Sequence, residues 1–147
     1  MKKPVIAVDI DDVLWAHFEA LRRWYNCTYG TQLQMSDNHP FSPVHWATPE
    51  LQAATLRRWG ASSVEEAVAR VRKFFETPDF THAKPFPLSA QVLQQLTSTY
   101  EIVAITAREF ELAAMTRDWL DYNYPRIFSE VHFTARFNLE GRSKDKV

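Results

Sequence analysis

The sequence predicts an α/β fold, a Rossmann-like three-layer sandwich with a parallel sheet and an inserted helical cap. Two short apolar runs, residues 5–8 and 102–105, end abruptly in polar residues. Such runs are typical of strands buried on both faces of a parallel sheet. A weaker run follows at residues 131–134. Helical spacing fills the chain between these runs, and this alternation predicts a sheet with right-handed crossovers.

Three helices are expected from apolar side chains that recur at intervals of three and four residues. The first follows the first strand, the second precedes the strand at 102–105, and the third follows that strand and ends before Pro125. Their apolar stripes are expected to face the core. In order they are Leu14, Phe18, Leu21 and Tyr25; Val92 and Leu96; and Leu112, Met115, Trp119 and Tyr122.

Two more helices are expected in the long insertion from their N-terminal signals. Thr48 followed by Pro49 is typical of an N-cap with proline in the first turn. Ser63 and Glu66 have the spacing of a capping box. The insertion is too long for one crossover, so residues 13–87 are expected to form a helical cap. Residues 1–12 and 88–147 are expected to form the core.

Composition and charge narrow the class of protein. Seventeen basic and eighteen acidic residues leave a formal charge of -1, so no electrostatic attraction to nucleic acid or an anionic membrane is expected. No stretch approaches the ~20 apolar residues of a membrane span. The single cysteine, Cys27, has no internal disulfide partner, which favours a reducing compartment. A cytoplasmic protein is expected, while the sequence does not indicate its oligomeric state.

Polar residues follow each expected strand at its carboxyl end, where ligands gather in open parallel sheets. Asp9 and Asp11 follow the first strand, Thr106 follows the second, and Lys144 lies beyond the third. Two carboxylates this close, after a buried strand, need a cation or another partner. Mg²⁺ suits them, because it prefers a few carboxylate oxygens together with water and substrate phosphate. The pattern therefore predicts a magnesium and phosphate site.

Residues 8–14, VDIDDVL, resemble the first motif of the haloacid dehalogenase-like (HAD) hydrolases. Residues 104–108, AITAR, resemble the second motif of that superfamily, an apolar strand that ends in threonine or serine. Lys144 stands where the lysine of the third motif is expected, and Lys146 is its rival. The resemblance covers the whole chain in the right order, including a helical cap between motifs one and two.

The resemblance implies a role for each matching residue. Asp9 would be the nucleophile and a metal ligand, forming an aspartyl-phosphate. Asp11 would be the general acid and base, and its main-chain carbonyl would also bind Mg²⁺. Thr106 and Ala107 would bind the phosphoryl group, and Lys144 would steady the phosphate and the nucleophile. The second aspartate favours phosphoryl transfer, because superfamily members that dehalogenate lack it.

The substrate is expected to be a small phosphomonoester, in particular a nucleotide. The stretch that begins at Thr106 is similar to 5'-nucleotidase-like members, including deoxyribonucleotidases. It also resembles polynucleotide kinase 3'-phosphatases, although the balanced charge favours a small substrate over nucleic acid. Arg108 is either a substrate contact or a partner in a surface ion pair. For Trp15 and Phe41, the sequence does not distinguish a position in the core from a position on the cap face.

The fourth motif of the superfamily, an acidic pair after a further strand, has no counterpart before Val147. The sequence is therefore expected to be a truncated member. Asp12, Glu109 and Asp145 are the candidates for a substitute metal ligand. One alternative is a catalytically impaired protein that binds a phosphorylated ligand or a protein partner. A second is a phosphotransferase or mutase that uses the same aspartyl-phosphate.

Overall fold

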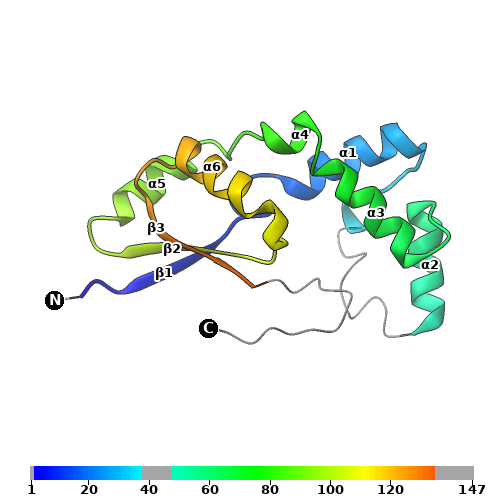
Figure 1. The fold of residues 1–147 in the computed structure, drawn as a ribbon, viewed down its shortest axis with the longest axis horizontal. Helices are drawn as coiled ribbons and strands as arrows, with labels where there is room; N and C mark the ends of the chain where they lie inside the picture. The colour runs from blue at the N-terminus through cyan, green and yellow to red at the C-terminus, as the bar shows by residue number, and fades with distance from the viewer. Residues whose placement is uncertain (1, 38–47, 135–147) are drawn as a thin grey trace. The chain divides into compact units, whose positions relative to one another are not determined.

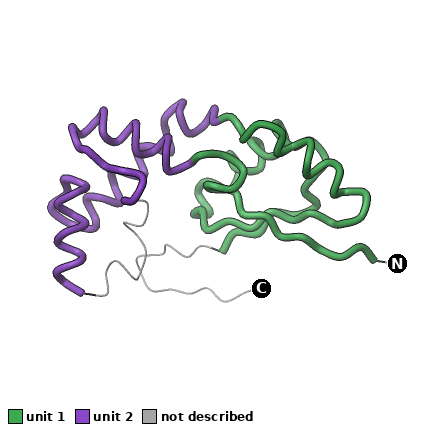
Figure 2. Tube along the Cα trace, turned by 180° about the vertical axis from the view of Figure 1, so that it is seen from behind, with its two compact units in different colours: residues 1–16, 84–147 green, residues 17–83 purple. Residues whose placement is uncertain are grey.

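The protein is described by a computed structural model that covers residues 2–37 and 48–134. The chain divides into two compact units, residues 1–16 with 84–147 and residues 17–83 (Figure 2). The sequence predicts junctions at residues 12/13 and 87/88, about four residues from those of the two compact units. Within the described ranges, no helix has both the length and the apolar character that a membrane crossing requires.

A parallel three-stranded sheet forms the centre of the first unit (Figure 1). Its order is that of the chain, β1 (Val5–Asp9), β2 (Glu101–Thr106) and β3 (Phe128–Phe133). Both pairings are parallel, so the carboxyl ends of all three strands lie at one edge. The predicted α/β fold with a parallel sheet is confirmed, and all three expected strands are present.

Helices α5 (Ser89–Leu96) and α6 (Ala113–Asn123) connect the strands, and the short 3-10 helix η3 (Phe110–Leu112) precedes α6. Both crossovers advance in the same direction across the sheet, so right-handed connections place both helices on one face (Figure 1). Leu93 of α5 and Leu120 of α6 are buried there. The prediction was wrong for two members of the stripes, because Val92 is 53% exposed and Tyr122 is 87% exposed.

The strands are less buried than the sequence predicts. Residues of the central strand β2 such as Ile102 and Ala104 are buried, but Val5 of β1 is 54% exposed and Ile105 is 38% exposed. Burial on both faces is therefore wrong for β1 over the described residues. The physical reason is that α5 and α6 cover one face of the sheet, and alternate side chains of a strand point to opposite faces.

The second unit is helical. Its described elements are α1 (His17–Tyr29), η1 (Met35–Asp37), α2 (Pro49–Trp59), α3 (Val64–Phe74) and α4 (Pro78–Thr81). Aromatic side chains fill its interior, with the rings of Tyr25 and Trp59 at 4.8 Å and those of Phe74 and Phe80 at 5.5 Å between centroids. The hydroxyl of Tyr25 donates to the carbonyl of Trp59 at 2.9 Å, which satisfies the buried polar group.

The predicted N-caps are confirmed. Thr48 Oγ1 accepts from the amide of Leu51 at the start of α2, and Ser63 Oγ accepts from the amide of Glu66 at the start of α3. In a capping box, Glu66 would reach the amide of Ser63. Here it accepts from the amide and hydroxyl of Ser62 instead, at 2.7 and 2.6 Å.

The first predicted helix begins later than its apolar stripe. Helix α1 starts at His17, so the buried Leu14 lies before it, in a turn where the Leu14 amide donates to the Ile10 carbonyl at 2.9 Å. The Leu14 carbonyl accepts from the amide of Phe86 at 2.7 Å and from the hydroxyl of Tyr124 at 3.3 Å. Leu14 therefore belongs to the first unit, where it ties this turn to two later segments.

Candidate active site

The carboxyl edge of the sheet brings the two predicted motifs together. Asp9 is the last residue of β1 and pairs in register with Ile105, one residue before the end of β2. Thr106 ends β2 and pairs in register with Phe133, the last residue of β3. Parallel pairing thus places residues 9 and 106, which are nearly a hundred positions apart, on neighbouring strands.

A tight turn follows β1 and sets the position of Asp11. Asp12 adopts φ of 60°, a left-handed conformation that aspartate tolerates better than most residues. The Asp12 amide donates to the carbonyl of Trp15 at 2.9 Å, which closes the turn. The indole Nε1 of the buried Trp15 donates to Asp11 Oδ1 at 3.2 Å. An indole N–H is only a donor, and the carboxylate four residues earlier supplies its acceptor.

A forked ion pair joins Asp11 to Arg108. Arg108 Nη2 lies 2.6 Å from Asp11 Oδ1, and Nε lies 3.1 Å from Oδ2. The third nitrogen, Nη1, donates to Thr116 Oγ1 on α6 at 3.0 Å. The side chain of Arg108 is 6% exposed and that of Asp11 is 26% exposed. Bidentate pairing of this kind orients a carboxylate as well as neutralising it, so the pair holds Asp11 in one orientation.

Asp9 is the less neutralised of the two carboxylates. Burial is the largest influence and raises the pKa of Asp9, and the neighbouring charges of Asp11 and Asp12 raise it further. A hydrogen bond of 2.8 Å from the amide of Ile10 and the charge of Arg108 act in the opposite direction. Within residues 2–37 and 48–134, no cationic side chain forms an ion pair with Asp9. An added cation would relieve this imbalance.

Thr106 ends β2 at this edge and is 2% exposed. Its Oγ1 accepts from the amide of Arg108 at 3.2 Å, and a hydroxyl in that role keeps its own hydrogen for donation to an acceptor. The carbonyl of Thr106 accepts from the amide of Thr134 at 2.8 Å, so the strand end is fixed from both sides. Ala107 follows Thr106 and is half-buried.

Asp9 and Asp11 offer oxygen atoms of the kind that a magnesium ion binds. Mg²⁺ commonly takes one or two carboxylates and fills its other positions with water and phosphate oxygens. The described part of the chain holds no group of three or more His, Cys, Asp or Glu side chains arranged for a metal. The fit therefore rests on the Asp9 carboxylate, whose charge is poorly balanced.

Four of the predicted site residues, Asp9, Asp11, Thr106 and Arg108, gather at this edge, with Ala107 between two of them. The predicted Lys144, its rival Lys146 and Asp145 lie outside the described residues. Phe41, which the sequence left open, lies there too.

Sequence reasoning missed two partners of this cluster, Trp15 and Thr116. Each is buried, and each makes a polar contact with Asp11 or Arg108. For Trp15, the i, i+4 spacing from Asp11 was a usable signal. Thr116 lies on α6, eight residues after Arg108, in a stretch that the sequence treated as an apolar stripe.

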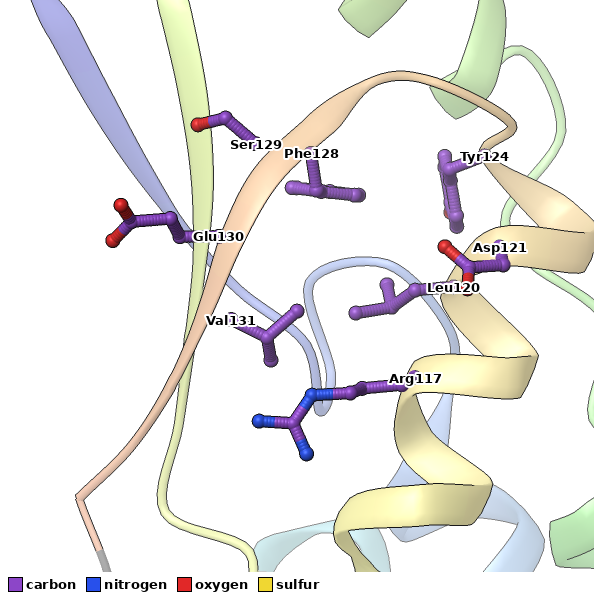
Figure 3. A pocket seen from close by; sticks show the side chains of 8 residues that line it. All are labelled: Arg117, Leu120, Asp121, Tyr124, Phe128, Ser129, Glu130 and Val131. Atoms are coloured by element: carbon purple, nitrogen blue, oxygen red, sulfur yellow. The ribbon is translucent and has the colours of Figure 1, made fainter.

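A shallow pocket of about 230 Å³ lies along α6 and β3 in the same unit. Figure 3 shows Arg117 and Leu120 of α6 directed toward Phe128 and Val131 of β3. None of the predicted catalytic residues lines this pocket.

Solved structures of HAD hydrolases share the fold. YfnB from Bacillus subtilis, assigned as a HAD-hydrolase and bound to magnesium, has a TM-score of 0.58 and 10% identity over 92% of this chain and 66% of its own. SP0104 from Streptococcus pneumoniae, a hydrolase of the haloacid dehalogenase-like family, has a TM-score of 0.58 and 16% identity over 88% and 60%. A Clostridium difficile protein assigned as a phosphatase has a TM-score of 0.58 and 16% identity, and the match covers 97% of this chain and 65% of that protein.

The fold is therefore that of the HAD-like hydrolases, and this chain spans 60–66% of the length of those three structures. Residues 3–138 match a sequence family within that class, and this match includes both motifs at the sheet edge. The chain belongs to the family described as 5' nucleotidase, deoxy (pyrimidine), cytosolic type C protein (NT5C). The comparison with curated proteins found no match.

Proposed function

We propose that this protein is a magnesium-dependent phosphohydrolase that acts on a nucleotide or another small phosphomonoester. The observation that carries this proposal is the cluster at the sheet edge. A poorly neutralised Asp9 lies two residues from Asp11, whose carboxylate Arg108 holds in a fork. Membership of a 5'-nucleotidase family supports both the reaction class and the nucleotide substrate.

The reaction would proceed in two displacements at phosphorus. A carboxylate oxygen of Asp9 attacks the phosphorus atom, and the bond to the ester oxygen breaks. The departing oxygen takes a proton from the carboxyl group of Asp11 and leaves as an alcohol. Water then attacks the same phosphorus and gives a proton to Asp11, which releases inorganic phosphate and restores Asp9. A magnesium ion held by Asp9 would balance the negative charge that gathers on the phosphoryl oxygens.

Three further groups would support these steps. The hydroxyl of Thr106 and the amide of Ala107 would donate hydrogen bonds to the phosphoryl oxygens. Arg108 would act as a positioning residue, because its guanidinium binds Asp11 and Thr116. Lys144 or Lys146 would supply the cation of the third motif. We also propose residues 17–83 as the cap and a cytoplasmic location, in keeping with the family's description as cytosolic.

The direct test is hydrolysis by the whole chain. The substrates are p-nitrophenyl phosphate and a panel of nucleoside 5'- and 3'-monophosphates, with magnesium and with a chelator. We expect turnover that the chelator abolishes and added magnesium restores. Turnover that persists in the chelator would contradict the metal-dependent mechanism. Preference for 3'-monophosphates would favour the polynucleotide 3'-phosphatase-like alternative.

Asp9→Asn separates the aspartyl-phosphate route from other chemistry. Removing a nucleophile costs a factor of about 10⁴ or more in kcat, so turnover should fall to background. Asp118→Asn, at an exposed position of α6, is the matched control and should keep full activity. Circular dichroism on both variants checks that each is folded.

A second candidate is a protein that binds a phosphorylated ligand without turnover. A folded chain that binds nucleoside monophosphates in a titration but hydrolyses none of them would establish this alternative.

A further inference from the structure

We propose that Phe110 and Phe133 form a stacking platform for the nucleobase of the substrate. This inference rests on the proposed function. It identifies the part of the proposed site that would distinguish a nucleotide from a sugar phosphate. It starts from an apolar surface beside the catalytic edge that the two-step reaction leaves without a role.

Both phenylalanines belong to segments that adjoin the residues proposed to hold phosphate. Phe133 ends β3 and pairs in register with Thr106, and adjacent strands in a sheet are about 4.8 Å apart. Phe110 begins η3, two residues after Arg108, which contacts Asp11. The two phenylalanines thus flank the second motif, one on the neighbouring strand and the other on the following turn. A phosphate bound at Thr106 would place the rest of the substrate within reach of them.

The two side chains form an aromatic pair of which Phe110 is the exposed member. Their ring centroids lie 6.0 Å apart with the planes inclined by 36°. The guanidinium carbon of Arg117 lies 5.0 Å from the centroid of the Phe133 ring. Phe110 is nevertheless 62% exposed, at the edge of the sheet where parallel α/β proteins bind ligands. A flat partner would bury this apolar surface and gain the usual stacking interaction.

The chemistry of the pair favours a nucleobase. Stacking of a base on an aromatic side chain is tolerant of base identity, because every base has a π-face. The cationic Arg117 also suits a polarisable ring with carbonyl oxygens at its rim. The platform should therefore add affinity for nucleoside monophosphates as a class and leave binding of a pentose phosphate unchanged.

The experiment compares two substrates in the whole protein. Steady-state kinetics with a deoxynucleoside 5'-monophosphate and with deoxyribose 5-phosphate are measured for the wild type and for Phe110→Ala. We expect kcat/KM for the nucleotide to fall roughly 5- to 100-fold, mainly through KM, since removing one stacking partner has an effect of about that size. The value for deoxyribose 5-phosphate should stay within about two-fold of wild type.

Two further variants at position 110 test the type of contact. Phe110→Trp keeps a stacking surface and should retain nucleotide preference, whereas Phe110→Leu keeps only apolar bulk and should lose most of it. Tyr122→Ala is the matched control, because Tyr122 is an exposed aromatic residue of the same unit, on α6, and is 87% exposed. It should leave both substrates unaffected.

Equal losses on both substrates, or no loss on either, would overturn the inference. If the wild type hydrolyses neither substrate, the proposed function fails, and titration calorimetry with the same two compounds decides the platform separately. Weaker binding of the nucleotide alone by Phe110→Ala would support the platform. Binding that Phe110→Ala leaves unchanged, or a wild type that binds no nucleotide, would contradict it and point to another occupant, such as a protein surface.

Discussion

Two arginine–carboxylate pairs, one in each unit, have the same shortest distance but different surroundings. In the first unit Arg108 Nη2 lies 2.6 Å from Asp11, which is 97 residues away in the sequence. In the second unit Arg70 Nη2 lies 2.6 Å from Glu66, four residues earlier on α3. The side chain of Arg108 is 6% exposed, while those of Arg70 and Glu66 are 20% and 37% exposed.

The surroundings give the two pairs different uses. Arg70 also donates to the carbonyl of Gly60 at 3.0 Å and lies 4.4 Å from the ring centroid of Tyr29, so its pair ties helices to one another. The guanidinium of Arg108 binds Asp11 and Thr116, at the carboxyl edge of the sheet, where open α/β folds generally bind ligands. A charge pair buried at such an edge is weak evidence for stability alone. The pair in the second unit therefore links helices, whereas the pair in the first unit orients the Asp11 carboxylate at the carboxyl edge of the sheet.

The largest expected effect comes from Asp11→Asn. An amide cannot exchange a proton with the leaving group or with water, so kcat should fall about 10²- to 10⁴-fold. Binding of inorganic phosphate should persist, because Asp9 and Thr106 are unchanged. Kinetics together with a phosphate titration measure both quantities. Full activity in this variant would remove Asp11 from the acid and base role. The Arg108–Asp11 pair would then have only a structural role, like the Arg70–Glu66 pair.

Arg108→Met should destabilise the folded protein by about 3 kcal/mol, because it leaves the partly buried Asp11 without its cation. Denaturant unfolding followed by circular dichroism measures the change. The double variant with Asp11→Leu should recover part of the loss, since it removes the uncompensated charge as well. A double variant no more stable than Arg108→Met would show that the arginine acts through packing and not through charge.

Ser63→Ala tests the second unit at the start of α3. The variant loses the cap that accepts from the amide of Glu66 at 3.1 Å, and such a loss costs about 1 kcal/mol. The same unfolding experiment applies. Phosphatase activity should be unchanged at temperatures below the transition, and a selective loss of activity would tie this helix to the chemistry.

Glu66→Gln should have the smallest effect, and that effect depends on pH. Hydrogen bonds from Ser62 and Arg70 hold the pKa of Glu66 at about 2, below its ordinary value of 4.5. A lowered folded-state pKa adds stability above pH 4.5, and this contribution is lost as the pH falls toward 2. The difference in Tm between wild type and variant should therefore be greatest near pH 7 and vanish near pH 2. A constant difference across that range would assign the effect to packing.

The predictions that held were those with local signals. Thr48 and Ser63 cap helices as expected, because an N-cap depends on an amide only three residues away. The choice of helix face was less reliable. Tyr122 has the spacing of a core residue but is 87% exposed, whereas Thr116 is polar and fully buried. Burial of Thr116 is tolerated because its hydroxyl accepts a hydrogen bond from Arg108.

The sequence by itself determined the parallel α/β fold, the positions of the strands and the polar residues at their carboxyl ends. Each follows from short-range pattern, namely the apolar run, the abrupt polar stop and the turn after it. Only the tertiary structure decided that Arg108 binds Asp11 and that Phe133 lies beside Thr106. These contacts depend on strand register and on the path of the crossovers, which bring distant residues together. Neither produces a periodic pattern that could be recognised in the sequence.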